Sequence, residues 1–435
     1  MILNLYEKVW IIAKINFIIY IPGNYYFYVK LFLYFVQKSD TLIAMITKEE
    51  IDNIIDLQDV IMEVKMNNIQ DTLQYLLACP FTSDDSGYEV ISRAIHLAVT
   101  YHPLSIPALV QLVKLIQQEP SLKKLDHVIL HLIFHYLQNS SAFPSECGGL
   151  SFVYRCLIDK VFTEDEIYIE IDHFYTIAKY FHTSLFWIFA YFAPIIEIKD
   201  EHRFNFTVHL FDEIKLKETF PNTFHSFFSH LEEFKADNWK LHRQEVLQIG
   251  SMSDIIRRDA IDELREKASH PSFSIDQTIQ ASLFEPSWFL FDEPTLIQYA
   301  AFHHSINCFT FCQMMDADLH LYDNKNKMLS QFAVAGGDVE IIRKVEQLGC
   351  SFNDTLHVAV GYFWFDIFLW LQQSKGIALN IDTPVFGTIL GSAAASGNLK
   401  AVQYCIENGI EVSAVNSLGV IIFYFILLHF IMLVI

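Results

Sequence analysis

The feature that most constrains the fold of this 435-residue chain is a segment that recurs 33 residues later. The run 295–301 (TLIQYAA) is followed by an apolar stretch and then by the run 317–320 (ADLH). Each landmark has a counterpart 33 residues further along, beginning with the run 328–334 (MLSQFAV). Two apolar stretches at helical spacing predict a pair of helices in each copy. A fixed period of this length is typical of repeat proteins, in which stacked neighbours bury one another's apolar faces.

Two further copies follow. The alanine at 333 recurs as Ala359 after 26 residues and as Ala393 after another 34, and the first step is shorter because the linking turn is trimmed. A small residue at these positions lets the first helix of one copy pack closely against that of the next. Glycine tolerates the left-handed backbone that ends a helix. We expect glycines to end the first helix at 337 and 397, and the second helix at 349, 376 and 409.

This series resembles the ankyrin repeat, whose pattern is T-P-L-H-x-A-A, a glycine turn, a second apolar helix and G-A-D-V-N. His357 keeps the histidine of that pattern. The sequence departs from it in several places: the proline is absent, Gln298 and Gln331 replace the histidine, and three residues replace turn glycines, namely His304, Asp316 and Phe363. The resemblance implies that the stack of repeats, and not the single repeat, is the folding unit.

The rest of the chain is divided by composition. We expect a hydrophobic N-terminal segment (1–44), a helical domain (45–250), a degenerate half-repeat with a long loop (251–293), ankyrin repeats (294–419) and a hydrophobic tail (420–435). The predicted fold class is therefore all-α, an ankyrin-repeat solenoid in the C-terminal half preceded by an irregular helical N-terminal domain. The order of segments is similar to that of an expanded protozoan family of ankyrin-repeat proteins whose helical N-terminal region has no assigned function.

Within the helical domain, apolar periodicity and prolines predict the helices, together with two capping boxes, Thr47 with Glu50 and Thr163 with Glu166. The helices are 47–78, 88–102, 105–118, 122–139, 164–181, 183–193, 204–214, 223–235 and 238–249, with a turn at Gly148–Gly149 and a break at Pro194. In the half-repeat, Ser253 is expected to cap a helix that runs towards Ala268, and the link 277–293 to form an extended finger or loop.

Both ends differ from the middle. Residues 1–44 contain two apolar stretches, each interrupted by a lysine, so neither gives the roughly 20 apolar residues of a spanning helix. Met45 precedes a well-capped helix, which suggests that it is the true start; a membrane anchor is the alternative. A fifth repeat begins at 416–419 (NSLG) and runs into the hydrophobic tail from Val420, which is the opposite of the polar cap that a stack needs. The tail reflects a departure from the natural reading frame, a helix covering the last repeat, or a tail anchor.

Composition limits the partners. The net charge of −21 repels nucleic-acid phosphates, and a basic or neutral protein fits better. Seven scattered cysteines indicate reduced thiols and a cytoplasmic protein, with membrane association through the termini as the alternative. No phosphate-loop, dinucleotide-binding, nucleophile-elbow or zinc-protease motif is present. We expect a monomer without cofactor, metal or catalytic site.

Two groups of residues could carry metal chemistry. His127, His131 and His135 are spaced four residues apart on one predicted helix. They span about 12 Å, so no single ion reaches all three, and a polar stripe is the simpler interpretation. A metal-dependent enzyme in the helical half nevertheless remains the less favoured alternative. Cys308 and Cys312 occupy apolar repeat positions, where buried thiols behave as small hydrophobic groups.

The sequence therefore predicts a non-catalytic scaffold that binds a protein partner. The resemblance to ankyrin repeats places recognition on the turn tips and on the exposed ends of the first helices. Carried over to this sequence, those positions are Phe302, His303, Asn324, Lys325, Lys327, Ala335, Gly361, Tyr362, Ala395 and Ser396, with Gly336 and the rest of the turn 323–327 beside them. Phe302 and Tyr362 are the expected anchors, because aromatic side chains dominate interface energetics.

Overall fold

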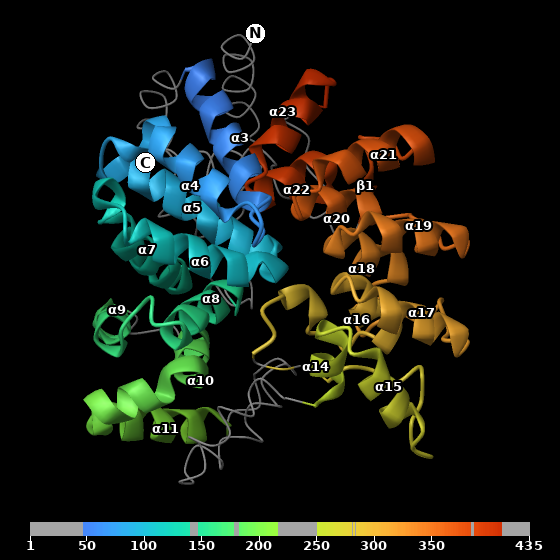
Figure 1. Ribbon diagram of the computed structural model, residues 1–435, viewed down its shortest axis with the longest axis horizontal. Coiled ribbons are helices and arrows are strands. Elements are labelled where there is room, and N and C mark those ends of the chain that lie inside the picture. Colours follow the sequence, from blue (N-terminus) through green and yellow to red (C-terminus); the bar gives the residue numbers. More distant parts are fainter. Residues whose placement is uncertain are drawn as a thin grey trace, which may run out of the picture. The chain divides into compact units, whose positions relative to one another are not determined.

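The computed structural model describes residues 47–139, 147–177, 182–215, 250–280, 282, 284–383 and 387–410. Helices dominate this part of the chain (Figure 1), and the named strands within it are only β1 (Asp382–Thr383) and β2 (Gly387–Thr388), which pair antiparallel. The predicted all-α class is confirmed. The chain forms two compact units, one of Ile61–Thr355 and the other of Met1–Val60 with Leu356–Ile435.

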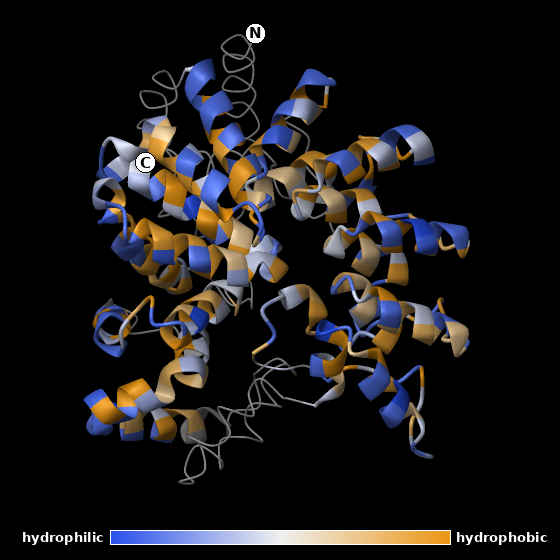
Figure 2. Ribbon diagram, in the orientation of Figure 1, coloured by the Kyte–Doolittle hydropathy of each residue, from blue (hydrophilic) through white to orange (hydrophobic). Residues whose placement is uncertain are grey.

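The larger unit begins with a helical region. Its helices are α4 (Ile69–Ala78), α5 (Asp85–Tyr101), α6 (Ile106–Ile116), α7 (Leu125–Asn139), α8 (Cys147–Ile158), α9 (Glu164–Ile177), α10 (His182–Lys199) and α11 (Glu201–Lys215). Short 3₁₀ turns begin at Pro80, Pro103 and Pro120, where proline fits the first position of a helical turn. Figure 2 shows apolar and polar residues in alternate patches along these helices, as expected for helices with one buried face.

Three expectations for this region are wrong. The helix expected over 47–78 is two helices, α3 (Lys48–Met62) and α4, because the Asn68 side chain bonds the backbone N–H of Lys65 (2.7 Å) and the carbonyl of Glu63 (3.0 Å). Such bonds compete with helix continuation. Pro194 does not end a helix but lies inside α10, where most of its neighbours are buried apolar residues.

The expected turn at Gly148–Gly149 is the third error, since both glycines lie in the first turn of α8. The reason is packing against α5. A Cβ atom on Gly148 would lie 2.1 Å from the carbonyl oxygen of Val99, far inside van der Waals contact. Glycine here serves close helix approach and not chain reversal. The expected capping boxes at Thr47/Glu50 and Thr163/Glu166 are confirmed by reciprocal bonds between each pair.

Helix pairs form the rest of the described chain. In the larger unit they are α14 (Met252–Arg257) with α15 (Ile261–Ala268), α16 (Leu296–Phe302) with α17 (Ile306–Met314), and α18 (Leu329–Gly336) with α19 (Val339–Gln347). They follow one another in sequence order in Figure 1, with α16 packed on both α14 and α18. The pairs α20 (Thr355–Gly361) with α21 (Phe365–Lys375) and α22 (Ile389–Ser396) with α23 (Leu399–Glu407) belong to the smaller unit, apart from Thr355.

The recurring small residues are the ones that allow this packing. The alanines at 300, 333, 359 and 393 are all fully buried. In the smaller unit, neighbouring pairs are joined by polar bonds as well: Asn398 donates to the carbonyl of Val360 (2.9 Å) and the Tyr404 hydroxyl donates to Gln372 (2.7 Å). The predicted recurrence of helix pairs is therefore confirmed within each unit.

The turns of the pairs keep a left-handed backbone even where glycine is replaced. The expected glycines at 337, 349, 376, 397 and 409 have φ between 67° and 82°. His304, Asp316 and Phe363 have φ of 58°, 56° and 60°, so these departures from the ankyrin pattern change the residue and not the conformation. His304 gains a hydrogen bond from its Nε2 to the carbonyl of Gly336 (2.5 Å), which offsets part of the strain.

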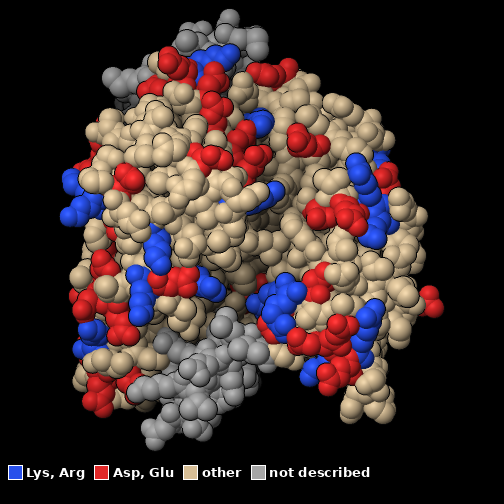
Figure 3. Space-filling view, viewed as in Figure 1, with Lys and Arg blue, Asp and Glu red and all other residues tan. Residues whose placement is uncertain are grey.

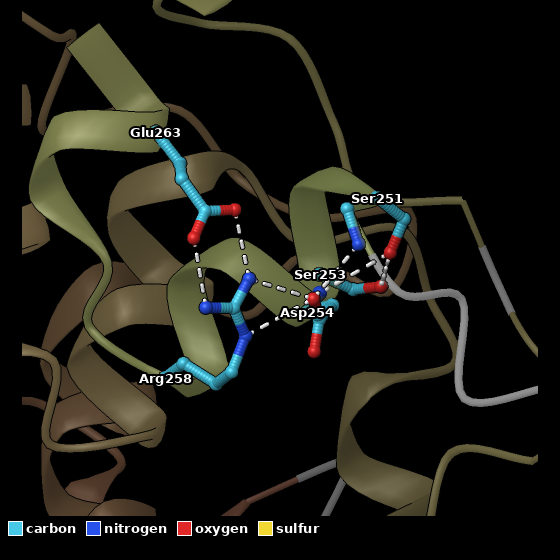
Figure 4. A network of polar contacts seen from close by, with 6 residues as sticks. Ser251, Ser253, Asp254, Arg258 and Glu263 are labelled. Atoms are coloured by element: carbon cyan, nitrogen blue, oxygen red, sulfur yellow. Dashed lines mark hydrogen bonds and ion pairs between the residues drawn. The ribbon is translucent and has the colours of Figure 1, made fainter. Parts of the chain in front are cut away.

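The expected half-repeat is a complete short pair, α14–α15. Its N-cap is Ser251, whose hydroxyl accepts from the N–H of Asp254, and not Ser253. Figure 4 shows how Arg258 ties the pair together: its guanidinium bonds Asp254 and also spans both carboxylate oxygens of Glu263 (2.9 and 2.8 Å). This pairing lowers the pKa of the Glu263 carboxyl.

No single helix in the described ranges is both long and apolar enough to span a bilayer. Only the bent combination Asp85–Tyr101 with Pro103–Ile116, which turns through 110°, reaches that length and composition. Several expectations lie outside the described residues: the N-terminal segment 1–44, the helices 223–235 and 238–249, the start of a fifth repeat at 416–419 and the tail 420–435.

Candidate protein-interaction surface

The turn at residues 322–327, hereafter the Asp323 turn, is the most exposed of the expected recognition elements. The Asp323 carboxylate accepts from the backbone N–H groups of Lys325 (2.9 Å) and Lys327 (2.7 Å). The N–H of Asn324 donates to the carbonyl of Asp292 (2.9 Å), and Asn326 has a left-handed φ of 60°. These bonds fix the backbone, so the exposed side chains of the turn are presented from a rigid frame.

Lys327 anchors this turn from inside. Its Nζ lies 2.7 Å from Asp292 and 2.9 Å from Asp323, and 4.7 Å from the centre of the Phe289 ring. Only 7% of the lysine side chain is exposed. Lys327 therefore does not belong to the recognition surface that the sequence predicted, because its ammonium group is buried and ion-paired.

The segment 284–293 covers the first two repeats. On either side of this segment, Thr278 and Thr295 form an antiparallel β-bridge that brings its two ends together. Phe289 packs against Phe302 (ring centres 6.3 Å apart) and Phe332 (5.1 Å). As a result Phe302 is only 1% exposed, and it cannot be the exposed anchor that the sequence suggested. Sequence reasoning missed this cover because the segment has no repeat counterpart.

A buried polar group holds the same segment in place. The Tyr299 hydroxyl donates to Glu285 (2.8 Å), and the guanidinium of Arg257 lies 4.0 Å from that carboxylate. Burial raises the pKa of the Glu285 carboxyl, and it lowers that of the nearby His303 imidazole well below its usual value. His303 is itself buried, so it too is corrected as an exposed contact residue.

The remaining expected positions are mostly enclosed. Ala335, Gly336 and Ser396 are buried, and the hydroxyl of Ser396 donates to the carbonyl of Ala393 (3.1 Å). Tyr362 is only 2% exposed, so the expectation that it is the second anchor is wrong. Gly361 is half-buried.

Exposed side chains concentrate on the Asp323 turn. Asn324, Lys325 and Asn326 are exposed there, and among the other expected positions so is Ala395. Tyr322 is 57% exposed and was not among the expected contacts. An aromatic residue directly before a polar turn was the signal that could have identified it.

The histidine stripe on α7 makes contacts of its own. His131 Nδ1 lies 3.0 Å from Glu170 on α9, and its ring neighbours those of His135 and His173. In the part of the chain that the structure describes, no three or more histidine, cysteine or acidic side chains are arranged to hold a metal ion. Cys308 and Cys312 are buried, and burial raises the pKa of the Cys312 thiol to about 12.

Comparison with known proteins adds little. No protein family and no curated protein matches the sequence. Among solved structures, the chain is similar to the ankyrin repeat domain of human ASB11, with 13% identity and a TM-score of 0.29 over 37% of this chain and 70% of that one. It is also similar to a structure of the predatory endopeptidase Bd0816 from Bdellovibrio bacteriovorus in complex with the immunity protein Bd3460. That match has 13% identity and a TM-score of 0.31 over 40% of this chain and 89% of that one.

These similarities are too low to support an argument, so the class rests on the contacts described above. The fold defines an all-α protein with ankyrin-like helix pairs.

Proposed function

We propose that the protein is a non-catalytic scaffold that binds a protein partner through the Asp323 turn. The supporting observation is that a buried ion-pair network fixes a turn whose outer side chains are free. Preorganised turns lose little conformational entropy on binding, which favours affinity. Tyr322 supplies the large aromatic contact and Lys325 the charge. Exposed aromatic and polar loop residues on a rigid scaffold are a recurrent recognition device.

Several parts of this proposal rest on sequence alone. The resemblance to ankyrin repeats suggests a protein as the partner and a role without catalysis. The scattered cysteines favour a cytoplasmic protein, and we propose that it acts as a monomer. The acidic net charge makes a nucleic acid an unsuitable partner.

Site-specific crosslinking tests the surface directly. A photoreactive residue in place of Tyr322 in the full chain should crosslink a partner in cells. The same residue at Glu340, an exposed position on α19, serves as the matched control and should not. The variant Tyr322→Ala/Lys325→Ala should lose most of the partner captured by the wild-type chain. Equal crosslinking at both positions, or undiminished capture by the double variant, would remove the Asp323 turn from the interface.

A further inference from the structure

In the smaller unit, helix α3 is fastened to the turn between α22 and α23. The amide of Gln58 donates to the carbonyl of Gly397 (3.0 Å) and accepts from the N–H of Leu399 (3.4 Å). Gln58 is buried, and beside it Asp59 pairs with Lys400 (2.6 Å). These contacts fix the position of the outer face of α3 relative to α23.

Further along α3 a groove opens between α3, α21 and α23, here called the α3–α23 groove. Its volume is about 300 Å³, and most of its lining is acidic or aromatic, with one lysine: Asp52, Asp56, Phe365, Tyr404, Glu407 and Lys400. Ligand pockets hold roughly 300–1,000 Å³. The groove is therefore suited to a single side chain of a partner and not to a large cofactor.

The floor of the groove favours a cation. The rings of Phe365 and Tyr404 meet edge to face, with centres 5.6 Å apart, and the Tyr404 hydroxyl is held by Gln372. Aromatic faces carry partial negative charge and attract cations. The protein already uses this property, because the Nζ of Lys400 lies 4.9 Å from the centre of the Phe365 ring.

The wall formed by α3 carries uncompensated negative charge. Asp52 and Asp56 are exposed, one helical turn apart, and neither makes an ion pair or hydrogen bond with a described residue. Glu407 on the opposite wall accepts from Gln403 (3.0 Å) and from no other described residue. Lys400 is neutralised by Asp59, so it does not balance these three carboxylates. Figure 3 shows acidic side chains gathered along α3.

We propose that the α3–α23 groove receives an arginine side chain from a basic segment of the protein partner. The guanidinium would stack on the exposed part of the Tyr404 ring and pair with Asp52 or Asp56. Arginine suits the groove better than lysine because its planar group stacks on aromatic rings and pairs with carboxylates through two bonds. The net charge of −21 accelerates the approach of a basic segment. This inference rests on the proposed scaffold function and specifies its partner.

The test uses the full chain and a fluorescent ten-residue peptide of alternating glycine and arginine. Matched peptides carry citrulline, which keeps the shape of arginine without its charge, or lysine. The arginine peptide should bind best and the citrulline peptide should not bind. The variant Asp52→Asn/Asp56→Asn should weaken binding about tenfold, and Tyr404→Leu about fivefold, as expected when a charged pair or a cation–π contact is lost.

The control variant is Glu63→Gln/Asp71→Asn, which removes the same charge from exposed positions outside the groove. It should change the affinity less than twofold. Equal weakening by both double variants would show a general attraction to an acidic surface, and the proposal that the α3–α23 groove binds arginine would be wrong. Absence of binding to wild type, or equal binding of the citrulline peptide, would overturn it too. Crosslinking at Tyr322 reports on the scaffold separately, so a positive result there with a negative result here rejects only the groove.

Discussion

Lys327 in the larger unit and Lys400 in the smaller unit each lie beside an aspartate and over a phenylalanine ring, but Lys327 pairs with a second aspartate and is far less exposed. Lys327 lies 2.7 Å from an aspartate and 4.7 Å from the centre of a phenylalanine ring, and Lys400 lies 2.6 Å and 4.9 Å from corresponding groups. The side chain of Lys327 is 7% exposed and that of Lys400 is 38% exposed. Water competes for the second ammonium and hardly reaches the first. The burial of Lys327 and its second carboxylate partner should therefore make it contribute more to stability than Lys400 does.

The difference in exposure gives the two lysines different roles in the protein. Breaking a buried ion pair costs free energy because the remaining charge stays desolvated. Lys327 should therefore hold the Asp323 turn in one conformation. A half-exposed pair contributes little to stability and can exchange partners, which suits a lysine at the edge of a binding groove. Three measurements test this contrast.

The largest effect is expected for Lys327→Met. This change leaves Asp323 and Asp292 without their cation inside the larger unit, and it should lower the free energy of unfolding by about 3–5 kcal/mol. Urea denaturation followed by circular dichroism measures it. Lys325→Met, on the exposed side of the same turn, should change stability by less than about 0.5 kcal/mol. Similar losses for the two variants would contradict the assignment of Lys327 as a buried anchor.

The buried imidazole of His96 should make the stability of the larger unit depend on pH. His96 stacks on Tyr136 at 4.1 Å, and burial lowers its pKa from 6.5 to about 3. Below pH 6.5 the unfolded chain takes up this proton and the folded chain does not, so stability falls as the pH falls. One pH unit of such a difference corresponds to about 1.4 kcal/mol, so two units cost roughly 2.7 kcal/mol.

Denaturation curves at about pH 6.5 and pH 4.5 give the unfolding free energies of wild type and His96→Gln. The contribution of His96 is the difference between the two proteins in how much this free energy falls on acidification. The variant should lose less stability on acidification than wild type. Parallel pH profiles would show that His96 is protonated in the folded chain and would weaken the argument that burial dominates.

The smallest effect is expected for Lys400→Met. Its ion pair with Asp59 is partly exposed, so the stability should change by less than about 1 kcal/mol and the change should shrink at high salt. A double-mutant cycle with Asp59→Asn isolates the pair. A coupling energy above about 2 kcal/mol would place Lys400 in the same class as Lys327 and remove the contrast.

The sequence predicted the helix pairs well because their constraints recur. The buried alanines at 333 and 393 and the left-handed glycines at 337 and 397 repeat at equivalent positions, so each copy supports the interpretation of the next. The helical region offers no such repetition. There, Gly148 and Pro194 were interpreted by local propensity alone, and tertiary packing overrides that propensity in α8 and α10.

The binding surface was less predictable for a different reason. The resemblance to ankyrin repeats placed Phe302 and Tyr362 on the recognition surface, but their exposure depends on which other residues of the chain pack over them. Phe289 comes from a segment without repeat periodicity, and nothing in its sequence shows that it covers Phe302. The Asp323 turn was identified from its polar residues, whereas the burial of Lys327 required the positions of Asp292 and Phe289.

The bond between Gln58 and Gly397 has a consequence for how the protein is made. These residues are 339 positions apart, and ribosomes add about 5–20 residues per second. Helix α3 therefore emerges roughly 17–68 s before its docking site exists. During that time α3, which carries the buried side chains of Ile54 and Leu57, cannot make its bonds to the α22–α23 turn. The smaller unit must assemble last, and chaperones that recognise exposed apolar helices have a defined interval in which to bind the nascent chain.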